Sequence, residues 1–500
     1  MKPCAGALWT FLALALASGC QESDPGPTSA DSSIPDAQVA DAPGLDVDDV
    51  VRIPVEKPQL LLTFNELPRA LNGSVPYSWE GGSDEEFLPR ANVHNMTLDL
   101  LLEQGSGPVD WSQTILHCGE IALDAQRLDV RSDDHARLLF TQQEPFPASG
   151  ESTCTGTVIG AGGDASASVA MEAVVMPAHL DPFVAPDVWL VTLERDLFEL
   201  QLTPMDDGSY EVVSLYEPAG NGVSDLDEAL TAIGLMSAIE AQAATRARSA
   251  LLSVVREEMR LIFGLDASGQ MQSESVPVTV FFEGDAGAPL FHSYDGKSFS
   301  MMALGGDGTP EEQPTGLVGR ALVDPNNQDH ENNTTYGLGV YPSAIVRQVL
   351  GQPIGALALA PMMPVVGVPM GEHPGDDLAM DPSFAPSPGD PQDVVERHQL
   401  YRLVIDLLGQ AIAATLAHEM GHSLGLVPPG PPPTGLFANM PALSLTDYDI
   451  DGWHIDTPGL NIMQTGAVTS WVEAVGQEMR FNPLNIAYLR RRLVVGALDP

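Results

Sequence analysis

The stretch LAHEMGHSLGLVPPGPPPTGLF, residues 416–437, begins as a helix that carries two histidines and continues into a proline-rich run. His418 and His422 are four residues apart, so a helix would place both imidazoles on one face. Zn²⁺ binds two imidazoles and one further ligand in sites that keep a coordination position open for catalysis. Glu419, beside the first histidine, could take a proton from a metal-bound water as general base. The pattern therefore predicts zinc-dependent hydrolysis.

The residues after this helix carry a resemblance to a known family. Gly425 allows a helix to end sharply, because glycine adopts positive φ at little cost. The motif resembles that of the metzincin metalloproteases, which continues from the second histidine through this glycine to a third histidine. In that family a methionine follows in a tight turn under the metal, and LNIMQTG (460–466) resembles this Met-turn, with Met463 as the methionine. The resemblance implies a metzincin-like zinc endopeptidase domain over residues 180–500, which ends in a helix within 479–493.

The position of the expected third histidine is occupied by Pro428. The leishmanolysin-like group of metzincins has an insertion between the glycine and the third histidine, which then falls shortly before the Met-turn. This chain has the same layout, with an insertion over 426–453 and His454 nine residues before Met463. The resemblance therefore implies that His418, His422 and His454 bind zinc.

Two other functions remain open from the sequence. The first is a gluzincin-like zinc protease in which Glu473 is the third protein ligand, although Gly425 and the Asn-Ile-Met of the turn argue against it. The second is a surface binding or adhesion lipoprotein whose protease fold has lost its activity. An intact Glu419 argues against that loss, because replacing this carboxylate is the simplest route to inactivity.

The insertion contains a second metal-binding pattern. Asp447, Asp449 and Asp451 alternate and are followed by Gly452, as in the first half of a calcium-binding loop. The closing glutamate of such a loop is replaced by Pro458, and Asp456 could supply another oxygen ligand. The pattern leaves two interpretations, a calcium site that supports His454 or an acidic surface turn.

The first residues of the chain predict export. Residues 1–19 combine Lys2 with an apolar run that is too short to span a bilayer. The run ends in Ala-Ser-Gly-Cys, which resembles a bacterial lipoprotein signal and implies cleavage before Cys20 and lipidation of that cysteine. The expected location is the bacterial outer membrane or cell surface, with the lipid as the only membrane contact. The alternative is ordinary secretion.

Residues 20–57 are rich in Asp, Pro, Ser and Ala, which predicts a disordered acidic tether. Residues 58–177 then show short strand-like runs between turns, which predict an all-β sandwich. Within it, residues 153–175 resemble the closing hairpin of bacterial immunoglobulin-like modules. The fold class expected from the whole chain is therefore multidomain, an immunoglobulin-like β-sandwich followed by an α/β (α+β) protease domain.

Four cysteines are present, and the predicted signal and lipid anchor would account for Cys4 and Cys20. In an oxidising compartment the remaining pair, Cys118 and Cys154, reads as one disulfide. The rival interpretation is that Cys118 binds the metal as an inhibitory thiolate.

The second half of the chain alternates strand and helix patterns. A hairpin is expected over 198–216, an uninterrupted helical segment over 224–265 and a buried strand over 276–285. A proline- and acid-rich loop (371–392) precedes the predicted active-site helix, residues 391–425.

The net charge of −46 and the pI near 4.2 bear on the partners. A polyanion repels nucleic acid and anionic membrane surfaces, so neither is an expected partner. The expected partner is a polypeptide substrate.

Overall fold

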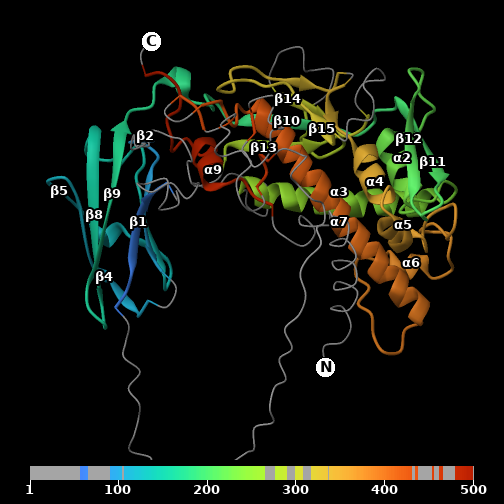
Figure 1. Ribbon diagram of the computed structural model, residues 1–500, viewed down its shortest axis with the longest axis horizontal. Coiled ribbons are helices and arrows are strands. Elements are labelled where there is room, and N and C mark those ends of the chain that lie inside the picture. Colours follow the sequence, from blue (N-terminus) through green and yellow to red (C-terminus); the bar gives the residue numbers. More distant parts are fainter. Residues whose placement is uncertain are drawn as a thin grey trace, which may run out of the picture.

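The two largest hydrophobic clusters of the described residues lie in an N-terminal β-sandwich and in a larger unit of mixed helices and sheets (Figure 1). The computed structural model describes residues 57–65, 90–103, 106–264, 276–289, 299–307, 317–335, 337–430, 434–436, 438, 453–454, 461–464 and 479–498. This arrangement of mixed sheets and helices agrees with the expected multidomain architecture.

Two sheets enclose the N-terminal core. The four-stranded antiparallel sheet has the order β1-β3-β7-β6, formed by β1 (Leu60–Phe64), β3 (Thr97–Leu102), β7 (His135–Leu139) and β6 (Asp129–Ser132). The five-stranded sheet has the order β2-β9-β8-β4-β5, formed by β2 (Arg90–Asn92), β9 (Ala165–Val174), β8 (Gly150–Gly160), β4 (Val109–Cys118) and β5 (Ile121–Leu123). Apolar residues of both sheets, among them Leu62, Leu100 and Val169, are buried together. The strands expected over 58–177 are thus present.

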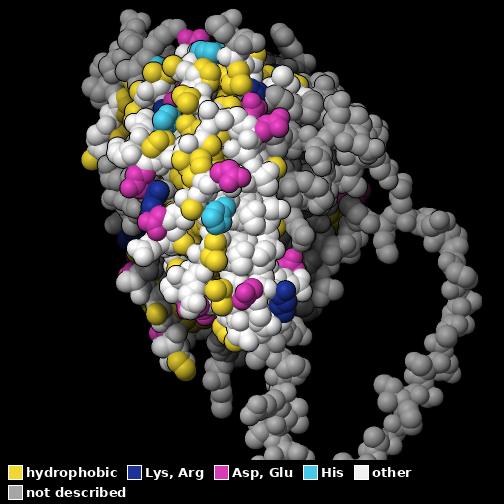
Figure 2. Space-filling model, turned by 90° about the vertical axis from the view of Figure 1, so that its left-hand side faces the viewer, with side chains coloured by type: hydrophobic (Ala, Val, Ile, Leu, Met, Phe, Trp, Pro, Cys, Tyr) yellow, Lys and Arg dark blue, Asp and Glu magenta, His cyan; other side chains and the backbone are white. Residues whose placement is uncertain are grey.

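Different interactions stabilise the two sheets of the sandwich. Within the five-stranded sheet a disulfide joins Cys118 of β4 to Cys154 of β8, as predicted. In the four-stranded sheet, buried Asp99 accepts hydrogen bonds from Nε of Arg137 at 2.6 Å and from the hydroxyl of Thr97 at 2.8 Å. On the surface, Figure 2 shows apolar side chains interspersed with acidic, basic and histidine side chains on the side of the molecule where the sandwich lies. This side is therefore not uniformly acidic, despite the charge of the chain.

The C-terminal segment of the chain pairs with β2 at the edge of the sandwich through an isolated bridge. Asn92 N–H donates to the carbonyl of Arg492 at 2.9 Å, and Val494 N–H donates to the carbonyl of Arg90 at 3.0 Å. An antiparallel bridge between Ala91 and Leu493 lies between these two bonds. The last residues of the larger unit thus close a sheet edge that would otherwise expose unpaired backbone groups.

The larger unit is built on a parallel sheet with the order β13-β10-β14-β16. Its strands are β13 (Val278–Phe282), β10 (Asp187–Thr192), β14 (Ser300–Ala303) and β16 (Asn332–Asn333). Two further antiparallel pairs are β11 (Phe198–Pro204) with β12 (Tyr210–Tyr216), and β15 (Gly319–Arg320) with β17 (Gly339–Val340). The helices are α2 (Asp225–Ala232), α3 (Ala241–Phe263), α4 (Pro342–Leu350), α5 (Pro353–Leu359), α6 (Asp376–Ala379), α7 (Gln392–Ser423) and α9 (Pro483–Leu489).

One expectation for this unit is wrong. The segment 224–265 is not a continuous helix, because α2 ends before Gly234 and α3 begins only at residue 241. Gly234 has φ +77°, and a Cβ there would overlap the carbonyl oxygen of Met362. The break therefore depends on a tertiary contact. The start of α2 is as predicted, since Ser224 caps it by accepting from the backbone N–H of Asp227.

The loop expected at 371–392 also contains the short helix α6, which the sequence analysis missed. The helix expected over 391–425 is present, because α7 runs from Gln392 to Ser423. It crosses α3 in the middle of the larger unit (Figure 1). Among the described helices, α7 alone is long and apolar enough to span a membrane. Its most apolar window is 67% buried within the protein, which is typical of a core helix.

Candidate metal centre

The centre begins at the C-terminal end of α7, which carries His418, Glu419 and His422. The helix stops after Ser423, and Gly425 follows with φ +78°. A Cβ at Gly425 would lie 2.7 Å from the backbone nitrogen of Asn326, so glycine is required both by conformation and by space. The sharp end of the helix is as expected from the sequence.

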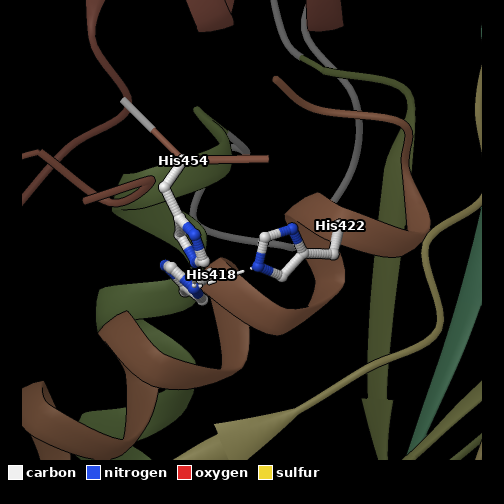
Figure 3. Close-up of side chains that lie close together, drawn as sticks. All are labelled: His418, His422 and His454. Carbon is white, nitrogen blue, oxygen red and sulfur yellow. Dashed lines mark hydrogen bonds between the residues drawn. The ribbon is translucent and has the colours of Figure 1, made fainter. Parts of the chain in front are cut away.

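His454 comes from a distant part of the chain and lies beside the two helix histidines (Figure 3). Its Nε2 is 3.2 Å from Nε2 of His418, which is 3.1 Å from Nε2 of His422. Two nitrogens bound to one tetrahedral zinc at ~2.0–2.1 Å lie about 3.3 Å apart. The three imidazoles therefore have a separation that fits a shared metal ion.

The short turn that contains Met463 orients the first of these histidines. Nδ1 of His418 lies 2.6 Å from the carbonyl oxygen of Ile462, which can only accept, so Nδ1 carries the proton. The lone pair of Nε2 is then available for a metal, since the partner of one ring nitrogen fixes the role of the other. Met463 itself is fully buried. A Cβ at Gly421 of α7 would lie 2.5 Å from its sulfur, so the turn packs directly against the helix.

Burial keeps the two helix imidazoles neutral. Removal from water and the neighbouring His454 lower the pKa of His418 to about 3, against the opposite effect of the hydrogen bond to Ile462. Burial, together with His418 and His454, lowers the pKa of His422 well below its usual value. A neutral imidazole has the free lone pair that a metal requires, so the electrostatics of the site favour metal binding.

Glu419 is the carboxylate nearest in sequence to these ligands, and it is only 4% exposed. Burial raises its pKa to about 8, and the nearby Arg320 opposes this rise. The side chain lies against Gly319 of β15. A buried carboxyl group on the same helix as two neutral imidazoles has chemistry suited to proton transfer.

The structure brings together the imidazoles of His418, His422 and His454, and it packs Met463 against Gly421 of α7. Glu419 follows His418 on the same helix, with its side chain against Gly319. The structure corrects the alternative role of Cys118, because this cysteine is bonded to Cys154 in the sandwich and is not a metal ligand. Several other predicted residues lie outside the described parts of the chain: Cys20, Asp447, Asp449, Asp451, Asp456 and Glu473.

Sequence reasoning missed two residues that surround Glu419, namely Gly319 and Arg320. They lie in the irregular stretch that follows β14, where no periodic pattern marks a strand. Gly421 was also missed, although its place between Glu419 and His422 was a signal for close packing on that side of the helix.

Comparison with known proteins adds little to these observations. No family model matches the chain, and no curated protein matches it. A structural similarity was detected to the endo-beta-1,4-mannanase from Thermotoga petrophila, with 7% sequence identity and a TM-score of 0.15. The match covers 18% of this chain and 18% of the mannanase. A similarity of this extent carries no argument about fold or function.

Proposed function

We propose that this protein is a zinc-dependent endopeptidase of metzincin type, with His418, His422 and His454 as metal ligands. The observation that carries the proposal is the approach of three Nε2 atoms to 3.1 and 3.2 Å from two separate parts of the chain. Three imidazole nitrogens at these separations can share one tetrahedral zinc ion. The low pKa of both helix histidines disfavours protonation of either ring.

Zinc in such a site supplies a Lewis acid that makes water nucleophilic at neutral pH. The residues of the chain would perform the remaining tasks. Glu419 would accept the proton of the attacking water and return it to the leaving amine. Ile462 would hold His418 in the tautomer that binds metal, and buried Met463 would pack beneath the helix. The reaction proposed is hydrolysis of a peptide bond.

Two features of the chain support the metzincin type over the gluzincin alternative. Gly425 ends α7 immediately after the second histidine, whereas a gluzincin-like site would need Glu473 as third ligand. The ligand atoms of His418, His422 and His454 lie within 4.8 Å of one another, which supports His454 as the third ligand. The leishmanolysin-like layout, with its insertion before the third histidine, accounts for both.

The remaining parts of the proposal concern the setting of the enzyme. Lipidation of Cys20 would anchor the protein at the bacterial outer membrane or cell surface, with residues 20–57 as a tether. The sandwich is proposed to be immunoglobulin-like, and the substrates to be extracellular polypeptides. The acidic loop at Asp447, Asp449 and Asp451 would bind calcium and support His454.

The experiment that tests this function compares wild type with Glu419→Gln. Both proteins should bind about one zinc per chain, because the ligands are untouched, but only wild type should cleave casein. Loss of a general base lowers the rate by ~10²–10⁴-fold. A wild-type protein that binds zinc but cleaves no polypeptide would instead favour the lapsed binding protein.

A further inference from the structure

The position of Glu419 depends on a residue that has no side chain. Gly319 of β15 lies so close to Glu419 that an added Cβ would be 2.5 Å from Oε1, 2.8 Å from Cγ and 2.9 Å from Cδ. Carbon atoms in van der Waals contact are about 3.5–4.0 Å apart. A methyl group at position 319 is therefore incompatible with the observed place of the Glu419 side chain.

The backbone at Gly319 is held in place by its own pairing. It pairs with Val340 of β17, and just before it the carbonyl of Val318 accepts from Tyr341 N–H at 2.8 Å. The carbonyl of Val340 in turn accepts from Gly305 N–H at 2.9 Å. The strand β15 is thus tied to β17, and β17 is tied to the end of β14.

Arg195 holds the segment before β17 through hydrogen bonds to backbone carbonyls. Its guanidinium donates to the carbonyl of Leu338 at 2.6 Å, to that of Gly305 at 2.9 Å and to that of Thr334 at 2.7 Å. β15 pairs with β17, so moving this pair away from α7 would strain the bonds of Arg195. A Cβ at Gly319 would instead displace the side chain of Glu419, which can rotate about its own bonds.

We propose that Gly319 is a positioning residue, because it leaves the space that the side chain of Glu419 occupies. This inference rests on the proposed function, in which Glu419 is the general base. Bound geometry governs proton transfer steeply, so a displaced carboxylate would lose much of its contribution to the rate. The residue itself contacts neither metal nor substrate in this account.

The test is Gly319→Ala in the full-length protein. We expect zinc content to stay at about one per chain, KM to change little, and kcat to fall by ~10-fold to 100-fold. The matched control is Gly389→Ala, because Gly389 is exposed and a Cβ there meets nothing within 4 Å. The control should retain both zinc and rate.

A second variant distinguishes positioning from general damage. Glu419→Asp shortens the side chain by one methylene and withdraws it from position 319. In the Gly319→Ala background this change should cost less than in wild type, a coupling that independent sites do not show. Additive losses, or loss of zinc together with activity in Gly319→Ala, would overturn the inference.

A crystal structure of Gly319→Ala gives a readout that needs no activity. The expected result is a Glu419 carboxylate shifted from its wild-type place while the three histidines stay. A carboxylate that superimposes on the wild-type one would contradict the inference, whatever the rates. If wild type itself cleaves no polypeptide, the proposed function fails, and this comparison still decides the role of Gly319.

Discussion

Nδ1 of His418 donates a hydrogen bond to the carbonyl oxygen of Ile462 at 2.6 Å. This bond joins α7 to a turn 44 residues further along the chain. It also determines which ring nitrogen is left for a metal. The same turn is bonded to the segment before α9, since Ile462 N–H donates to the carbonyl of Arg480 at 3.0 Å. The ligand geometry at His418 therefore depends on how the C-terminal part of the chain is packed.

The first prediction concerns the third ligand. His454→Ala should lose most bound zinc, because a site with two histidines lacks the third protein ligand that catalytic zinc sites use. Pro428→Ala is the matched control, since Pro428 occupies the position of the missing histidine, and it should lose none. Zinc content after dialysis measures both. Full zinc in His454→Ala would shift the third ligand to one of the neighbouring aspartates, with Asp456 the first to test.

The second prediction concerns the contact between α7 and Met463. Gly421→Ala should destabilise the larger unit by about 1–3 kcal/mol, the usual cost of overpacking, because its Cβ would lie 2.5 Å from the Met463 sulfur. Thermal unfolding of the zinc-free protein measures the loss. Combining it with Met463→Ala, which is itself destabilising, should cost less than the sum of the two single losses, since the truncated side chain leaves room for the added methyl group. A Gly421→Ala protein as stable as wild type would show that the turn with Met463 can move away from α7 without a loss of stability.

These features differ in how far sequence could predict them. His418 and His422 were predictable because helical periodicity is local. The pairing of His454 with them depended on the resemblance to a known layout. Gly319 was not predictable, because its partner Glu419 is 100 positions away in the chain and β15 has only two residues. Gly234 was missed for a related reason, because the carbonyl that leaves no room for a side chain there belongs to Met362, in a distant part of the chain.

The sandwich illustrates the same limit. The strands of the sandwich were recognisable because apolar residues have strand-like spacing in the sequence. Burial along β8 and β9 alternates accordingly. The pairing of the C-terminal residues with β2 was not recognisable, because backbone pairing between residues so distant in the chain leaves no local pattern. The pairing depends on the fold of both units.

The third prediction tests this pairing. A site-specific protease sequence inserted between Val175 and Met176, where Val175 is 61% exposed, should allow the chain to be cut between the two units. The fragments should stay together during gel filtration, because Val494 N–H and the carbonyl of Arg492 still bond to β2. The Cys118–Cys154 disulfide lies within one fragment and cannot hold them together.

The control for this cut uses one buried position. Val494→Pro removes the N–H that donates to the carbonyl of Arg90, whereas Val494→Ala keeps it and loses a similar amount of packing. The proline variant should separate into two peaks after cutting more readily than the alanine variant. Fragments that separate at once in the unsubstituted protein would show that the shared edge does not hold the units together.

The fourth prediction concerns acid and the sandwich. Burial raises the pKa of Asp99, but the hydrogen bonds from His135 and Arg137, the charge of Arg137 and the hydroxyl of Thr97 outweigh it, so the pKa lies below the usual 3.8. A depressed pKa contributes stability above the unfolded value that is lost as pH falls through the folded value. The free energy of unfolding of the sandwich should therefore decline below about pH 4.

Asp99→Asn supplies the control for this effect. At neutral pH it should destabilise the sandwich by about 3–5 kcal/mol, because it leaves buried Arg137 without its carboxylate. Its unfolding free energy should also fall less steeply with acid than that of wild type. Denaturant unfolding at a series of pH values measures both. Equal slopes for the two proteins would assign the acid sensitivity to other carboxylates.

The most direct test of the central claim is anomalous diffraction at the zinc absorption edge from crystals of the full-length protein grown with zinc. The account predicts one strong peak at ~2.0–2.1 Å from the Nε2 atoms of His418, His422 and His454. Glu419 should not be among the ligands. A peak elsewhere, or none between these three imidazoles at full zinc saturation, would contradict the assignment of a zinc centre and the peptidase function built on it.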